Sequence, residues 1–244
     1  MKFNWLFLGV AALACSAAQA QGTAPYSAVS VCYDTTAVRP WLTQSGKPLF
    51  AALEAQAGVT LTLVPLPWRR CLSDVSNGTM AGAVGASFSE DRARYAVYPT
   101  TPKGQLDLSR RLEASSYSLY RIKGAKVDWD GKQFSHLTTP VIVQGGYSVA
   151  ADLTRLNVQV DQSASSPEIV FKMVDAGRAE LGAMITEDGD KLLALPAYAL
   201  KLEKIKAPVV AKPYFLIFGK RFYSDNTAFV ERVWAGIATV RESP

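Results

Sequence analysis

Strand and helix patterns alternate along most of this 244-residue chain, and this alternation constrains the fold more than any other feature of the sequence. Residues 28–33 form a short apolar run typical of a buried strand, and 48–57 carry apolar residues at helical spacing. Strand patterns recur at 59–64 and 81–86, with a helical pattern over 68–77 between them. The order β-α-β-α-β predicts a parallel sheet with helices on both faces.

A second unit of the same kind follows in the second half of the chain. Strand patterns at 140–143, 158–160 and 180–185 alternate with helical patterns, and an amphipathic helix is expected over 227–240. Chains of this length approach the size at which one hydrophobic core divides into two. The sequence therefore predicts an α/β protein of two lobes.

Charge and composition exclude several classes of function. The 26 Lys and Arg residues outnumber the 21 Asp and Glu residues, giving a formal net charge of +5, but the charges are dispersed. Nucleic-acid binding is not expected, because no basic arm or aromatic-plus-basic motif is present. The single histidine, His136, leaves no His-rich metal site, and we expect neither a metal ion nor a cofactor.

The first twenty residues have the pattern of a secretory signal peptide. Lys2 provides a positive start, an apolar run covers 5–14, and Ala18-Gln19-Ala20 gives a small-x-small site. The run is about half the length that a membrane-spanning helix needs. We predict cleavage after Ala20 and a periplasmic location; a lipoprotein signal ending at Cys15 is the alternative.

Export changes the interpretation of the two remaining cysteines, Cys32 and Cys71. Each lies beside the end of a predicted strand, and the carboxyl ends of neighbouring parallel strands meet at one edge of a sheet. Disulfides persist in oxidising compartments. We predict a Cys32–Cys71 disulfide, with two buried free thiols as the alternative.

The end of the strand at 81–86 has the features of an anion site. Ser87 ends the strand, Ser89 is a good N-cap, and Arg92 lies in the first turn of the helix that follows. A guanidinium near main-chain N–H groups and a hydroxyl can bind a carboxylate. Thr186 occupies the matching strand end in the second unit, and open α/β sheets bind ligands at these ends.

The stretch 64–92 carries a strand, an aromatic residue, a helix ending in a glycine turn and the pattern G-x-S-x-[ST]-x-x-R. In these features the chain resembles the bacterial periplasmic solute-binding proteins of family 3, the amino-acid-binding type. The resemblance covers essentially all of the chain after residue 20. It implies a two-lobed type II periplasmic-binding-protein fold, each lobe a mainly parallel sheet flanked by helices.

The same resemblance implies how the chain is divided. Lobe 1 would comprise 21–112 and 210–244, and lobe 2 would comprise 113–209. The lobes would be joined by a hinge of two segments, near 112–116 and 206–212.

Ligand-binding residues follow from the family's motifs. In the family, the Ser/Thr hydroxyl and the Arg of the motif hold the ligand's carboxylate, which implies Ser87 and Arg92 here. Asp34 resembles the family's acidic contact to a ligand amine or side chain. Trp41 and Trp68 fall where the family often places aromatic residues that sandwich the ligand.

The second lobe matches the family less closely. Gly146-Tyr147-Ser148 corresponds to a G-[ST]-[ST] turn, with Tyr147 as a departure from the pattern. The family's second-lobe aspartate, which pairs with an α-amine, has no clean match; Thr186 and Glu187 are the nearest candidates. The family therefore implies an α-amino acid as the ligand, but this sequence matches the family's pattern clearly only at the carboxylate end of such a ligand.

The sequence thus indicates a binding protein rather than an enzyme. A monomer would capture a small polar ligand that bears a carboxylate, such as an amino acid, and deliver it to an ABC permease or a membrane receptor. One alternative is a sensory protein without a transporter. A second is a periplasmic dehydratase on the same scaffold, similar to cyclohexadienyl dehydratase, with Glu187 or Asp34 as general acid.

Overall fold

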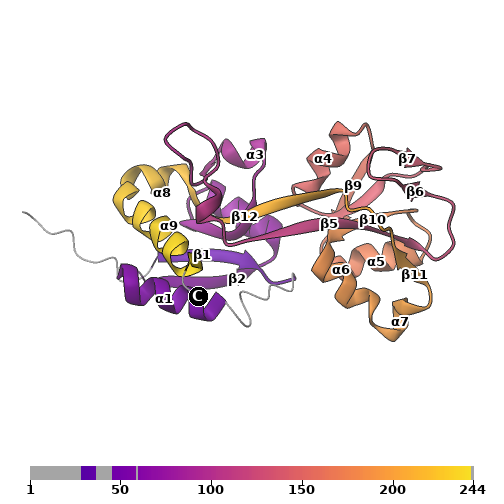
Figure 1. The fold of residues 1–244 in the computed structure, drawn as a ribbon, viewed down its shortest axis with the longest axis horizontal. Helices are drawn as coiled ribbons and strands as arrows, with labels where there is room; N and C mark the ends of the chain where they lie inside the picture. Colours follow the sequence, from indigo (N-terminus) through magenta and orange to yellow (C-terminus); the bar gives the residue numbers. More distant parts are fainter. Residues whose placement is uncertain (1–28, 37–45, 59, 243–244) are drawn as a thin grey trace, which may run out of the picture.

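The computed structural model describes residues 29–36, 46–58 and 60–242 (Figure 1). The predicted signal peptide and Trp41 lie outside these residues. Two lobes lie side by side along the long axis of the molecule, connected by long strands (Figure 1). The prediction of a two-lobed α/β fold is confirmed.

The first lobe contains three parallel strands. These are β1 (Val29–Asp34), β2 (Leu61–Leu66) and β3 (Gly82–Ser87), in the order β2-β1-β3. They alternate with helices α1 (Gly46–Ala57) and α2 (Trp68–Ser76). The β-α-β-α-β order predicted from the sequence is therefore present, and it brings Asp34 and Ser87 to the same edge of the sheet.

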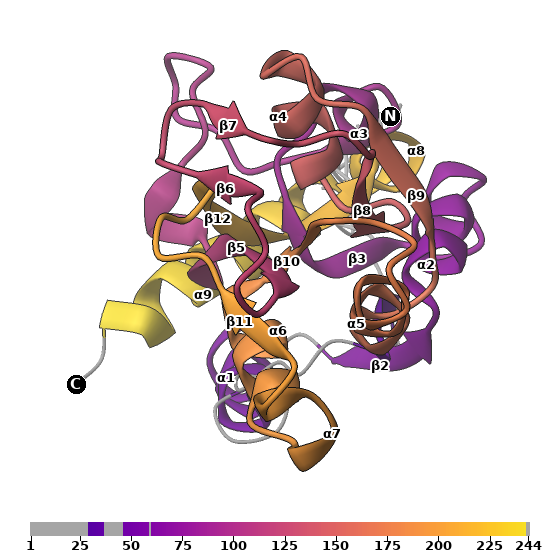
Figure 2. The ribbon, with the colours of Figure 1, turned by 90° about the vertical axis from the view of Figure 1, so that its right-hand side faces the viewer.

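The second lobe repeats this arrangement. Its parallel strands are β8 (Val141–Gln144), β9 (Val160–Ala164) and β10 (Gly182–Ile185), and its helices include α4 (Val149–Arg155) and α5 (Pro167–Asp175). Figure 2 shows α4 on one side of these strands and α5 on the other. Ser166 caps α5 by accepting a hydrogen bond from the Ile169 N–H, as Ser-Pro before a helical pattern predicts.

Two ten-residue strands, β5 (Glu113–Ile122) and β12 (Val210–Gly219), run from one lobe into the other. They pair antiparallel, β12 also pairs with β3, and β5 also pairs with β10. One sheet in the order β2-β1-β3-β12-β5-β10-β8-β9 therefore passes through both lobes. The predicted hinge segments, 112–116 and 206–212, overlap the residues at which β5 and β12 pair, 113–117 and 210–214. The lobe boundaries stay a prediction.

Ten further elements complete the fold of the described residues, and the 16-residue helix α9 is the longest of them. They are α3 (Glu90–Ala93), β4 (Ala96–Val97), η2 (Leu108–Arg110), β6 (Asp128–Trp129), β7 (Phe134–Ser135), α6 (Thr186–Leu193), α7 (Pro196–Ala199), β11 (Leu202–Lys204), α8 (Lys220–Asp225) and α9 (Thr227–Glu242). In the ranges described, no helix is long and apolar enough to cross a membrane.

Strand β2 differs from its prediction. The strand pattern covers 59–64, but β2 continues to Leu66, with Pro65 opposite Tyr33 of β1. Because β2 lies at the edge of the sheet, no strand lies on its outer side to accept a hydrogen bond, and a proline, which has no N–H group, is tolerated there. Helix α6 begins at Thr186, directly after β10.

The Cys32–Cys71 disulfide is confirmed and ties β1 to α2. The two Cα atoms are 5.6 Å apart, and both side chains are fully buried. Asp34 follows Cys32 by two residues and Trp68 precedes Cys71 by three, so the bond fixes the two segments that carry these predicted site residues.

Candidate functional site

A cavity lies between the two lobes, at the carboxyl ends of the lobe-1 strands. It is lined by Tyr33, Asp34, Trp68, Val84, Gly85, Ser87, Arg92, Tyr117, Tyr147 and Tyr214. These side chains leave room for about one water molecule. The structure therefore brings five predicted site residues together around a cavity that is nearly filled by the chain's own side chains.

Arg92 is buried beside the end of β3. Ser89 caps α3 by accepting a hydrogen bond from the Arg92 N–H, which fixes the residue in the first helical turn. The guanidinium donates to the main-chain oxygens of Ser87 at 2.6 Å and Gly146 at 2.5 Å, and lies over Trp68 at 5.3 Å from the ring centroid. Its residue is 4% exposed. Within the described part of the chain, no carboxylate forms an ion pair with it.

Two hydroxyl groups meet across the lobes next to Arg92. The oxygens of Ser87, from β3, and Ser148, from the turn before α4, are 2.7 Å apart. Lys212 of β12 donates to the Ser148 hydroxyl at 3.1 Å and forms an ion pair with Asp152. Burial lowers the pKa of Lys212, and Asp152 opposes that shift. The predictions from sequence did not include Lys212 as a site residue, because its position depends on the pairing of β12.

Asp34 is 6% exposed and accepts four hydrogen bonds. Oδ1 accepts from the N–H and the hydroxyl of Thr36, at 2.9 and 2.8 Å. Oδ2 accepts from the Tyr147 hydroxyl at 2.6 Å and from Gln144 Nε2 at 3.1 Å. Gln144, at the end of β8, was also missed, because its contact with Asp34 crosses the two lobes.

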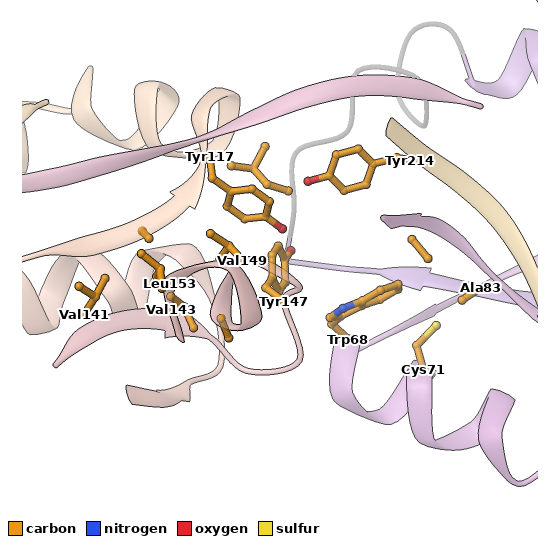
Figure 3. Close-up of a cluster of buried hydrophobic side chains, with 14 of the residues drawn as sticks. Trp68, Cys71, Ala83, Tyr117, Val141, Val143, Tyr147, Val149, Leu153 and Tyr214 are labelled. Carbon is orange, nitrogen blue, oxygen red and sulfur yellow. The ribbon is translucent and has the colours of Figure 1, made fainter. Parts of the chain in front are cut away.

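Aromatic rings surround the contact between the lobes (Figure 3). The Tyr147 ring meets Trp68 and Tyr117 edge-on, at centroid distances of 6.5 and 6.3 Å. The indole N–H of Trp68 donates to the main-chain oxygen of Gly146 at 3.2 Å. Gly146 has φ +84°, a left-handed conformation that favours glycine, and this turns its carbonyl toward Trp68 and Arg92.

Thr186 and Glu187 lie outside the lining of this cavity. The Thr186 hydroxyl contacts those of Ser116 and Ser118 on β5, at 2.8 and 2.7 Å. Glu187 is exposed and accepts a hydrogen bond from Ser115. The structure thus does not bring either residue into the group around Arg92. His136, the single histidine, is exposed.

Within the described ranges, no cluster of three or more His, Cys, Asp or Glu side chains could hold a metal ion. The groups available to a ligand are instead the Arg92 guanidinium, the hydroxyls of Ser87 and Ser148, and aromatic rings, with Lys212 beside Ser148 and paired with Asp152. Such a set suits a small organic anion, since charge-assisted hydrogen bonds to guanidinium and ammonium groups are the strong ones.

No family model and no curated protein matches this sequence. Solved structures do match it. A histidine kinase sensor domain with similarity to periplasmic binding proteins gives a TM-score of 0.69 at 14% identity, covering 89% of this chain and 91% of that one. The chain has the type II periplasmic-binding-protein fold.

Two further structures share this periplasmic-binding-protein fold. The GluR0 ligand-binding core from Nostoc punctiforme, in complex with L-glutamate, gives a TM-score of 0.62 at 13% identity, covering 88% of this chain and 93% of that one. The holo ArgBP from T. maritima gives a TM-score of 0.65 at 12% identity, covering 89% of this chain and 92% of that one. Fold similarity at these identities leaves the ligand to be argued from the site.

Proposed function

We propose that this chain is an exported, periplasmic solute-binding protein of family 3 that closes its lobes around a small ligand bearing a carboxylate. The observation that carries the proposal is Arg92, a buried guanidinium that no carboxylate of the described chain neutralises. It lies beside the hydroxyls of Ser87 and Ser148, one from each lobe. A ligand bound there would contact both lobes.

The energetics of a buried cation support this assignment. Taking a charge out of water is costly unless a counter-charge and hydrogen bonds compensate for the lost hydration. In the described chain, the Arg92 guanidinium contacts only neutral groups, including two main-chain oxygens and the Trp68 ring. A ligand carboxylate would add the counter-charge and could accept two parallel bonds from the guanidinium.

The geometry favours binding over catalysis. A dehydratase would need a carboxylic acid placed at the substrate. Asp34 already accepts four hydrogen bonds from its own chain, and Glu187 is exposed outside the cavity lining. Turnover of prephenate or arogenate by the purified protein would revive the enzymatic alternative; a flat trace is expected.

The first role that we propose is delivery of the ligand to an ABC permease, with the protein acting as a monomer. The matching structures include the substrate-binding protein of an amino acid ABC transporter. The match to a histidine kinase sensor domain supports the second candidate, a sensory protein that docks on a membrane receptor. In either role, the lobes would move where β5 and β12 connect them, near 112–116 and 206–212.

Arg92→Ala tests the proposal. A thermal-shift screen of amino acids, other carboxylates and polyamines identifies the ligand, since ligand binding raises the melting temperature. Calorimetry with that ligand should show that the variant loses about 2–5 kcal/mol of binding free energy, which raises Kd by roughly 30-fold or more. Arg94→Ala, which removes an exposed arginine of the same segment, is the matched control and should bind normally. Unchanged affinity of Arg92→Ala would contradict the proposal.

A further inference from the structure

Tyr147 is a departure from the family's turn pattern, and its side chain lies at the centre of the contact between the lobes. The residue belongs to lobe 2 and is 7% exposed. Its ring packs against Trp68 of lobe 1 (Figure 3), and its hydroxyl donates to Asp34 Oδ2 at 2.6 Å. A serine or threonine at this position would be too short to fill the same space.

The contacts of Asp34 leave no site for a ligand ammonium group. A carboxylate offers about four lone-pair positions, and Asp34 already accepts four hydrogen bonds. All of the donors are neutral groups of the chain, on Thr36, Gln144 and Tyr147. An ammonium group would reach Oδ2 only by displacing Tyr147 or Gln144. It would therefore exchange hydrogen bonds that already exist rather than add new ones.

The contacts of Arg92 are different in this respect. Its acceptors are the uncharged main-chain oxygens of Ser87 and Gly146. A guanidinium has more N–H donors than these two bonds use, so a ligand carboxylate could add hydrogen bonds to Arg92 and also supply the missing counter-charge. Lys212 donates to the Ser148 hydroxyl next to Arg92, but its own charge is already paired with Asp152. The site therefore favours the binding of an anionic group over that of a cationic group.

We infer that the ligand is a small carboxylate without an ammonium group, and that Tyr147 determines this specificity by holding Asp34. This inference rests on the proposed function, in which the carboxylate binds at Arg92. In this inference, Tyr147 and Gln144 occupy the Asp34 carboxylate, whereas the family's pattern assigns that carboxylate to the ligand.

Matched pairs of carboxylates test the inference on the unmodified protein. The pairs are L-glutamate with glutarate, L-alanine with propionate, and L-phenylalanine with 3-phenylpropionate, so that the members of each pair differ in the ammonium group. Calorimetry of each pair gives a ratio of Kd values. In the pair that binds most tightly, the member without the ammonium should bind about tenfold more tightly or better. Equal binding, or tighter binding of the amino acid, would overturn the inference.

Variants of Tyr147 test its assigned role. Tyr147→Ser removes both the ring and the hydroxyl and should raise the affinity for the amino-acid member by about tenfold, so that the Kd ratio approaches one. Tyr147→Phe removes only the hydroxyl and should shift the ratio in the same direction by less. Tyr223→Phe is the matched control, because it removes a phenol that donates to Glu231 outside the cavity. If neither Tyr147 variant changes the ratio, Tyr147 does not set the specificity.

The two proposals fail in different ways. If an amino acid binds at least as tightly as its partner, and Arg92→Ala abolishes that binding, the inference is wrong and the proposed function stands. If the carboxylates bind and Arg92→Ala has no effect, the proposed function is wrong and the inference falls with it. If no member of any pair binds, both are contradicted.

Discussion

The disulfide between Cys32 and Cys71 allows a quantitative prediction about stability. The bond joins residues 39 positions apart, linking β1 to α2. In the chain-entropy model, closing a loop of this length restricts the unfolded chain by about 4 kcal/mol at 25 °C. The double variant Cys32→Ala/Cys71→Ala should therefore lose about 4 kcal/mol of unfolding free energy.

Urea-induced unfolding, followed by tryptophan fluorescence and circular dichroism, measures this loss. A reductant should lower the midpoint of the intact protein, since the unfolded chain exposes its disulfide. The double alanine variant is its own control, because the same reductant should leave its midpoint unchanged. A variant within about 1 kcal/mol of the intact protein would refute the reasoning.

Two further predictions concern the sheet and the acid side of the stability profile. A Cβ at Gly82 would overlap the main-chain oxygen of Ile217 on the neighbouring strand. Gly82→Ala should therefore lower the unfolding free energy, measured in urea, by about 3 kcal/mol. A loss below about 1 kcal/mol would contradict the packing described. The hydrogen bond from Arg121, followed by that from the Gly124 N–H, lowers the pKa of Glu203 below its ordinary value of 4.5. The stabilisation that the ionised Glu203 contributes is present above pH 4.5 and is lost as the pH falls through the lowered folded-state pKa. The melting temperatures of wild type and Glu203→Gln should therefore converge between pH 6 and pH 3. A difference that stays constant over this range would contradict the prediction.

Local patterns predicted much of the fold. Apolar runs and a glycine turn indicated β1, α2 and β3, and Ser89 was identified as a helix cap from its own side chain. The disulfide followed because neighbouring parallel strands place Cys32 and Cys71 at one edge. These features depend on residues close in sequence or on a general rule of sheet geometry, so one sequence suffices to predict them.

The features that the sequence did not predict depend on long-range contacts. Lys212 reaches Ser148 only through the pairing of β12, and Gln144 reaches Asp34 only because the two lobes approach each other. No local pattern encodes either contact. Pro65 would end a central strand but is tolerated in β2, because that strand lies at the sheet edge. Thr186 shares a strand-end position with Ser87, yet its hydroxyl is taken by serines of β5.

The central claim is that Arg92 holds the carboxylate of a ligand enclosed between the lobes. A crystal structure of the protein with the tightest-binding carboxylate from the screen tests it most directly. We expect the ligand's carboxylate oxygens about 3 Å from the Arg92 guanidinium and from the Ser87 hydroxyl, with groups of both lobes around it. A ligand bound elsewhere, with Arg92 still donating to the main-chain oxygens of Ser87 and Gly146, would contradict the account.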